Sequence, residues 1–179
     1  EIDKIIKDIT SERINTNNLK ICTVGRIGFQ KNPKLFNEIA ERFPQYTFTW
    51  IGDGELKESL TSKNIEITGW ASRENVLKQL CKNDIFILPS LWEGLPIALL
   101  EAMYLGKICI VSNVIGNRDV IKSGENGFVC DNLNEYENVI NSISGKKVDI
   151  NRIQKNVISD IKNNYTITNM CKKYKEIYN

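Results

Sequence analysis

The sequence predicts an α/β domain built on a doubly wound, Rossmann-like parallel sheet of about six strands, with a helical C-terminus. Short β-branched runs alternate with amphipathic helical stretches, which is typical of βαβ units. The run at residues 84–88 is apolar from Ile85 to Leu88, and such a run is typical of a strand buried on both faces of a parallel sheet. We therefore expect residues 19–179 to form one domain around one sheet.

The predicted strands are short, and most end at a glycine or a polar turn. They lie at residues 19–24, 46–51, 65–68, 84–88, 107–111 and 127–130. The helices between them are predicted from apolar positions that recur on one face. Pro33 opens the first, a short second one ends at Leu60, and Ser72 is the expected N-cap of the third. Further helices are predicted at residues 95–105, 134–143, 150–161 and 166–178.

Residues 1–18 fit this unit poorly. Ile2, Ile5, Ile6 and Ile9 predict a short amphipathic helix, and the polar residues 10–18 are loop-like. The first residue is Glu1, with neither an initiator Met nor the pattern of a signal peptide. We expect this segment to arrive from a missing N-terminal domain, and the chain to be a fragment of a longer protein.

Composition excludes several classes of protein. The 179 residues are 41% apolar and 26% charged, and 24 Lys and Arg nearly balance 22 Asp and Glu. No basic patch is visible, so no nucleic-acid partner is predicted. No apolar stretch approaches the roughly 18 residues that a membrane span needs. Five scattered cysteines with no C-x-x-C pair predict small buried side chains in a reducing cytoplasm, not a zinc site.

The chain has no histidine, which removes the commonest general base and the commonest metal ligand. Neither a G-x-G-x-x-G fingerprint nor a Walker motif occurs, and this argues against a hydride-transfer domain. There is also no D-x-D pair of the kind that holds a metal, so no metal and no cofactor is predicted. Chemistry here would depend on carboxylates, on Lys and Arg, and on the backbone.

The loop after the first predicted strand combines glycine with positive charge. In doubly wound sheets, ligands bind beyond the carboxyl ends of the strands, where the strand order reverses. Gly25, Arg26 and Lys31 lie in this loop. A forked guanidinium and a mobile ammonium suit a diphosphate. A solvated basic loop is the alternative for this pair taken alone.

The loop after the fourth strand places two carboxylates around a helix start. Glu93 precedes the helix, and Glu101 lies within an otherwise apolar stretch, so it should be buried and need hydrogen-bond donors. Gly94 lets a ligand approach the backbone, and the helix N-terminus offers free N–H groups. Ligand hydroxyls would satisfy Glu101. The alternative is that Glu93 caps the helix and Glu101 meets a basic side chain of the same protein.

Taken together, these loops resemble the C-terminal donor-binding domain of retaining glycosyltransferases with the GT-B fold, family 4 (glycosyl transferases group 1). The motifs run in the family's order over about residues 19–131. The similar segments are Val24-Gly25-Arg26 with Lys31, Ile51-Gly52-Asp53-Gly54, Thr68-Gly69-Trp70, and Pro89-Ser90-x-x-Glu93-Gly94-x-Pro96 with Glu101-Ala102-Met103. By this resemblance, residues 19–179 form a nucleotide-sugar-binding domain.

The resemblance implies a role for each charged residue. Arg26 and Lys31 would neutralise the diphosphate of a nucleotide sugar as it leaves, so no metal would be required. Glu93 would face the donor sugar and complete the catalytic set. Glu101 would accept hydrogen bonds from both ribose hydroxyls.

Backbone contacts are implied at the remaining site residues. Gly25 lies in the phosphate loop, and the backbone of Gly94, Leu95 and Ile97 would meet sugar and phosphate. Gly69 and Trp70 would lie beside the base, through their backbone atoms. One loop departs from the family, because Gly116-Asn117-Arg118-Asp119 stands where G-G-x-P-E is common, which makes Arg118 a candidate chain-specific contact.

The resemblance implies a cytoplasmic enzyme, peripheral at the inner face of the membrane through its missing acceptor domain. The donor would be a UDP-, GDP- or ADP-sugar, and the acceptor a lipid-linked glycan or bacterial cell-surface polysaccharide. The fragment alone is expected to bind donor without transferring sugar. The alternatives are half of a sugar-nucleotide epimerase, which would turn over donor without acceptor, and a non-catalytic nucleotide-sugar-binding module.

Overall fold

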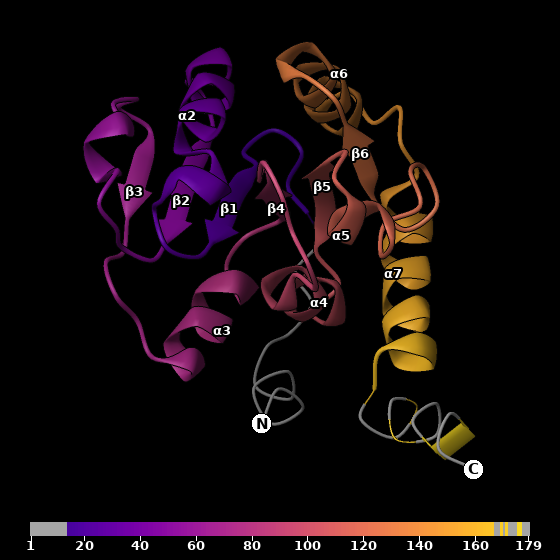
Figure 1. Cartoon of the computed structure of the whole chain (residues 1–179). Helices are drawn as coiled ribbons and strands as arrows, with labels where there is room; N and C mark the ends of the chain where they lie inside the picture. Colours follow the sequence, from indigo (N-terminus) through magenta and orange to yellow (C-terminus); the bar gives the residue numbers. More distant parts are fainter. Residues whose placement is uncertain (1–13, 167–168, 170, 172–174, 177–179) are drawn as a thin grey trace.

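The computed structural model describes residues 14–166, 169, 171, 175 and 176. The helices predicted over residues 2–9 and 166–178 fall wholly or largely outside these residues. Six parallel strands form one sheet in the order β3-β2-β1-β4-β5-β6 (Figure 1). The strands are β1 (Lys20–Val24), β2 (Thr47–Ile51), β3 (Ile65–Ile67), β4 (Ile85–Leu88), β5 (Ile108–Ser112) and β6 (Phe128–Cys130). All six predicted strands are confirmed.

The helices are α2 (Pro33–Arg42), α3 (Arg73–Cys81), α4 (Ile97–Tyr104), α5 (Ile115–Arg118), α6 (Leu133–Ser144) and α7 (Ile150–Asn164), with short 3₁₀ turns η1 (Phe29–Lys31) and η2 (Lys57–Ser59). Ser72 caps α3 as predicted, since its side chain accepts a hydrogen bond from the Asn75 amide. The segment before Leu60 forms only the turn η2. The helix predicted at residues 95–105 begins two positions later, because Pro96 has an extended ψ of 89° and acts as its N-cap.

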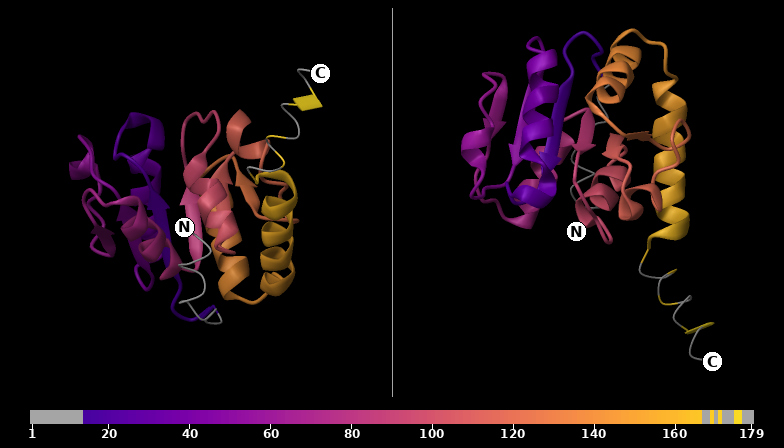
Figure 2. Two further views of the ribbon diagram at one scale, coloured as in Figure 1. Left: turned by 90° about the horizontal axis from the view of Figure 1, so that it is seen from below. Right: turned by 45° about the horizontal axis from the view of Figure 1, so that its top comes forward.

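Helices cover both faces of the sheet (Figures 1 and 2). On one face α2 and α6 pack on alternate strand residues such as Ile21 and Ile85, all fully buried. On the other face α3, α4 and α7 pack on the intervening residues, such as Cys22 and Phe86. The central strand β4 is buried on both sides and β5 is buried from Ile108 to Val111, which explains why their sequences are continuous apolar runs.

The strand order reverses between β1 and β4. The chain runs outward from β1 through β2 to β3, then returns to place β4 on the other side of β1, where Ile21 pairs with Ile85. The loops that follow β1 and β4 therefore lie side by side at the carboxyl end of the sheet and lead away in opposite directions. This is the point at which doubly wound sheets bind ligands.

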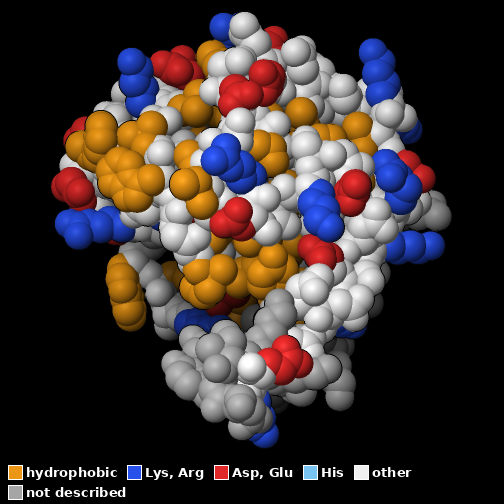
Figure 3. Space-filling view, turned by 45° about the vertical axis from the view of Figure 1, so that its right-hand side comes forward, with side chains coloured by type: hydrophobic (Ala, Val, Ile, Leu, Met, Phe, Trp, Pro, Cys, Tyr) orange, Lys and Arg blue, Asp and Glu red, His pale blue; other side chains and the backbone are white. Residues whose placement is uncertain are grey.

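The charges of the surface are mixed. On the face shown in Figure 3, acidic and basic side chains alternate and gather into no large area of one sign, in keeping with a net charge of +2. Within the described residues, no helix combines the length and the apolar character that crossing a membrane requires.

Candidate functional site

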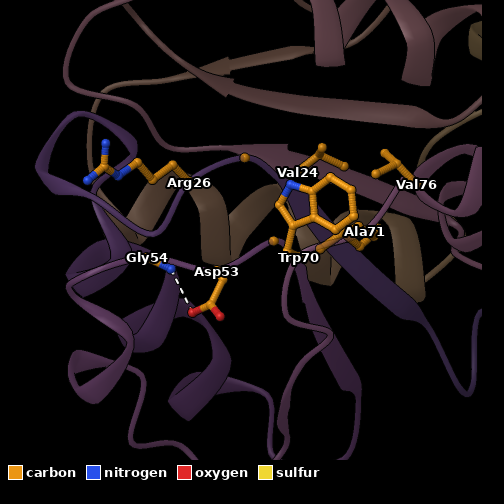
Figure 4. A pocket seen from close by; sticks show the side chains of 10 residues that line it. Val24, Arg26, Asp53, Gly54, Trp70, Ala71 and Val76 are labelled. Carbon is orange, nitrogen blue, oxygen red and sulfur yellow. Dashed lines mark hydrogen bonds between the residues drawn. The ribbon is translucent and has the colours of Figure 1, made fainter. Parts of the chain in front are cut away.

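A cavity of about 540 Å³ opens at the carboxyl ends of β1 and β2 (Figure 4). It is built from the loops after β1, β2 and β3 and from the start of α3. The residues that line it are Val24, Gly25, Arg26, Ile51, Gly52, Asp53, Gly54, Trp70, Ala71 and Val76. Of the residues predicted to bind a ligand, Gly25, Arg26 and Trp70 lie in this wall.

Backbone atoms form the wall between the first two loops. The Gly25 amide donates to the carbonyl of Ile51 (3.1 Å), and the indole N–H of Trp50 donates to the carbonyl of Gly25 (2.9 Å). Gly52 has a φ of +147°, and a Cβ there would lie 2.1 Å from the Gly25 oxygen. Only a glycine at position 52 permits the two backbones to lie this close. The lack of a side chain at Gly52 also leaves the cavity open.

Trp70 contributes its side chain to the cavity. The side chain is 85% exposed, and Figure 4 shows the indole beside Val24, with Ala71 and Val76 in the same wall. The resemblance implied backbone contacts at Gly69 and Trp70, whereas the structure presents an open aromatic face. Gly69 lies outside the cavity wall and provides the turn before Trp70, with a φ of +73°.

Lys31 and Glu93 form an ion pair between the β1 and β4 loops. The Nζ atom of Lys31 lies 2.6 Å from Oε1 of Glu93, with the side chains 19% and 6% exposed. Glu93 therefore does not cap α4, which was one of the two possibilities. Lys31 also packs against Gly25 of the cavity wall, because a Cβ on Gly25 would lie 3.2 Å from the Lys31 Cε.

Further contacts join the same two loops. The Leu91 amide donates to the carbonyl of Gln30 (2.8 Å), and Nε2 of Gln30 donates to the carbonyl of Trp92 (2.9 Å). The rings of Phe29 and Trp92 lie 6.0 Å apart and are both largely exposed. We call these contacts, with the Lys31–Glu93 pair, the β1–β4 clasp. It fixes a cation and a buried carboxylate at the switch point of the sheet.

Arg26 has an acidic partner of a different kind. Its Nε donates to Oε2 of Glu55 at 2.9 Å, and both side chains are more than half exposed. A backbone hydrogen bond and the Arg26 guanidinium hold the pKa of Glu55 below its usual range. An exposed pair of this kind is weak, so the guanidinium can turn to another anion at little cost.

Glu101 meets a basic side chain of the same chain, which was the alternative left open for it. Nη2 of Arg73, the first residue of α3, lies 3.0 Å from Oε1 of Glu101 on α4. The Glu101 side chain is only 13% exposed, and burial raises the pKa of its carboxyl against the opposing effect of Arg73.

The start of α4 is shaped by Gly116, which the sequence analysis named only as part of the loop that departs from the family pattern. A Cβ on Gly116 would lie 2.0 Å from the carbonyl oxygen of Gly94, so α5 packs directly on the backbone after Glu93. A Cβ on Gly94 itself would meet open space. Leu95 and Ile97 are exposed, with 61% and 55% of their surface accessible.

The structure thus arranges the predicted residues in three neighbouring groups. Gly25, Arg26 and Trp70 line the cavity, and the β1–β4 clasp joins Lys31 to Glu93. Glu101 on α4 pairs with Arg73 of α3. Gly94, Leu95 and Ile97 link the last two groups along the chain. Arg118 donates to Oδ1 of Asn113 (3.3 Å) on the β5 loop and is absent from the cavity wall.

Sequence reasoning missed two residues that pair with predicted site residues, namely Glu55 and Arg73. Arg73 left a signal, since a cation in the first turn of a helix opposes the helix dipole and needs a tertiary explanation. Over the described part of the chain, no three His, Cys, Asp or Glu side chains come close enough together to hold a metal ion.

A Rossmann-like domain with cationic loops at its switch point is the kind that forms the C-terminal half of GT-B glycosyltransferases. The chain belongs to the family described as Glycosyl transferases group 1, whose sequence model matches residues 4–158.

Similar proteins agree with this assignment. The chain is 35% identical over 183 residues to an Escherichia coli UDP-Gal:alpha-D-GlcNAc-diphosphoundecaprenol alpha-1,3-galactosyltransferase, with 92% of this chain and 46% of the relative covered. The fold matches that of Anabaena HepE in complex with UDP and glucose (TM-score 0.78, 18% identity, 99% of this chain and 51% of that chain).

It also matches the C-terminal domain of LpcC, a Glycosyl Transferase Group 1 family protein of Francisella tularensis (TM-score 0.68, 22% identity, 83% of this chain and 87% of that chain). The chain spans about half the length of the curated relatives that match nearly all of it.

Proposed function

We propose that this chain binds the nucleoside diphosphate of a nucleotide sugar and supplies the donor half of a retaining, metal-independent glycosyltransferase. The observation that carries the proposal is the pair of cations, Arg26 and Lys31, in one loop beside the cavity at the switch point. A leaving diphosphate gains negative charge as the sugar departs, and two fixed cations stabilise that charge. The same cations take the place that a metal has in other sugar transferases.

Both cations are occupied by carboxylates in this structure. Arg26 is paired with the exposed Glu55, and Lys31 with the buried Glu93. A diphosphate therefore competes with these partners when it binds. Release of Lys31 would leave the Glu93 carboxylate free to face the donor sugar, which couples occupation of the phosphate site to the group nearest the reacting carbon.

We further propose uridine diphosphate as the nucleotide. The E. coli relative is named for a UDP-Gal donor and a diphosphoundecaprenol-linked acceptor, and HepE was solved with UDP. The open face of Trp70 would receive the base, since an exposed aromatic ring stacks on any base. The acceptor would be a lipid-linked or polysaccharide glycan, held by the part of the protein outside this chain, at the cytoplasmic side of the membrane.

Calorimetric titration of this chain with UDP, GDP and ADP tests the donor site. We expect UDP to bind most tightly, and Glu101→Ala to remove the binding. Glu58→Ala, which removes an exposed carboxylate on η2 away from the cavity, is the matched control and should bind like the wild type. Binding that survives Glu101→Ala, or no binding of any nucleotide, would contradict the proposal.

Four further assays separate the related functions. Hydrolysis or epimerisation of a UDP-sugar by this chain without acceptor would favour an epimerase half-domain. Transfer of sugar by this chain alone would contradict the expectation that the fragment is inactive. Metal independence predicts that nucleotide affinity is the same with EDTA as with Mg²⁺. Binding without transfer, when the chain is joined to the acceptor half of a related enzyme, would favour a non-catalytic module.

A further inference from the structure

Arg73 and Glu101 join two helices next to the cavity. Nη2 of Arg73 lies 3.0 Å from Oε1 of Glu101, and the partners differ in environment. The carboxylate is 13% exposed, whereas the guanidinium is 63% exposed. The pair therefore consists of a nearly buried anion and a cation that still contacts solvent.

The place of Arg73 in its helix is unfavourable by local rules. It is the first residue of α3, directly after the N-cap Ser72. The positive end of the helix dipole favours acidic residues there, as Glu74 illustrates at the next position. By contrast, Lys78 lies in the last turn and pairs with Glu74 at 2.7 Å, as expected for a surface helix. The ion pair with Glu101 on another helix explains why a cation occupies this position.

Arg73 also lies at the edge of the cavity. Trp70 and Ala71, just before it, line the wall, and Val76, one turn later on α3, lines it too. Residues three apart lie on the same side of a helix, so Arg73 and Val76 are neighbours. Arg73 therefore connects the α3 end of the cavity wall to the Glu101 carboxylate through its ion pair.

We propose that Arg73 is a positioning residue for donor binding, which fixes the Glu101 carboxylate where it meets the sugar hydroxyls of the nucleoside. The proposal rests on the proposed function, because it assigns Glu101 to those hydroxyls. It adds a residue that lies outside the motifs by which the chain resembles its family. Nη2 of the guanidinium holds the carboxylate, and 63% of the Arg73 side chain remains exposed.

Electrostatics supports the proposal. In its charged form a carboxylate accepts hydrogen bonds on both oxygens, whereas protonation turns one of the oxygens into a donor. Burial raises the pKa of Glu101, and the charge and hydrogen bond of Arg73 lower it. Other polar groups near α4 point elsewhere, since Lys107 Nζ donates to the Cys81 carbonyl and Gln154 Nε2, from α7, donates to the Gly106 carbonyl. Arg73 is the charged group that acts on this pKa within the described part of the chain.

The experiment compares UDP affinity in Arg73→Gln, Arg73→Lys and the control Lys78→Gln between about pH 5 and about pH 8. Lys78→Gln removes an ion pair from the same helix but leaves Glu101 untouched. We expect Arg73→Gln to weaken UDP about tenfold, with a larger loss at the lower pH, and Arg73→Lys to restore most of the affinity. The 2′,3′-dideoxy analogue of UDP should be indifferent to all three changes.

A second background separates positioning from general structure. In Glu101→Gln, addition of Arg73→Gln should cause no further loss, because both changes remove the same function. An undiminished loss in that background, or an Arg73→Gln variant with the affinity and pH profile of Lys78→Gln, would overturn the proposal while leaving the donor site intact.

A measurement without ligand keeps the two proposals apart. The carboxyl carbon of Glu101, followed by NMR during a pH titration, should show a higher pKa in Arg73→Gln than in the wild type. If none of UDP, GDP and ADP binds the wild type, the proposed function fails and the donor role of Arg73 fails with it. If UDP binds but the pKa of Glu101 does not change in Arg73→Gln, only the role of Arg73 fails.

Discussion

The Nζ atom of Lys31 lies 2.6 Å from Oε1 of Glu93, although 62 positions separate the two residues in the chain. The contact exists because β1 and β4 are neighbours in the sheet, so that their loops meet at its carboxyl end. The Glu93 side chain is 6% exposed, so loss of Lys31 would leave a largely buried carboxylate without its ion-pair partner. The pair that we propose for donor binding therefore also joins two loops of the fold.

Removal of the cation should destabilise the domain. Lys31→Met keeps most of the aliphatic stem but leaves the Glu93 carboxylate buried without its cation. We expect the free energy of unfolding in urea to fall by about 1–3 kcal/mol, the cost of an unsatisfied buried group. The double variant Lys31→Met/Glu93→Gln should recover most of this loss. Arg26→Met, which breaks the exposed pair with Glu55, should change stability by less than about 0.5 kcal/mol.

Glu101→Gln should stabilise the domain at neutral pH. Burial raises the pKa of Glu101 above the unfolded value, so the folded state binds the proton more tightly. Stability of the wild type therefore falls as pH rises from the unfolded pKa through the raised folded pKa. The variant lacks this loss. Its melting temperature should match that of the wild type below about pH 4 and exceed it at pH 7. If the melting temperatures of the variant and the wild type differed by the same amount at both pH values, the pH dependence would not come from the Glu101 carboxyl.

Alanine at two glycines near the β4 loop should separate an effect on stability from an effect on binding. Gly116→Ala would place a Cβ 2.0 Å from the Gly94 oxygen. We expect the free energy of unfolding to fall by about 1–3 kcal/mol and nucleotide binding to be lost as well. Gly94→Ala meets open space, so its unfolding should be unchanged while UDP affinity falls about tenfold. Unfolding in urea and calorimetric titration with UDP on both variants test this. A Gly94→Ala protein with wild-type affinity would show that UDP does not contact the Gly94 backbone.

Trp70 should stack on the base. Trp70→Ala should weaken UDP by about 1–3 kcal/mol, and Trp70→Phe, which keeps an aromatic face, should retain most of the affinity. Because the side chain is 85% exposed, its emission should change when UDP binds. Equal affinity in the alanine and phenylalanine variants would show that the base contacts only backbone at this loop.

Local sequence patterns were sufficient for the strands. Apolar runs such as the one at β4 reflect burial on two faces, and glycines such as Gly25 mark places where backbones touch. The ion pairs were out of reach, because pairing of Arg73 with Glu101 depends on the packing of α3 beside α4. The short helix α5 was missed because Gly116 and Asn117 are weak helix formers, and tertiary packing against Gly94 overrides that preference.

The strand order also has a consequence for how the chain folds during synthesis. Strand β1 can pair with β2 soon after both leave the ribosome, but its other edge stays open until β4 has been made, because Ile21 pairs with Ile85. An unpaired apolar strand edge invites association with other nascent chains. Translation speed between β3 and β4 therefore sets how long this edge is exposed, and a slow stretch there would favour aggregation over folding.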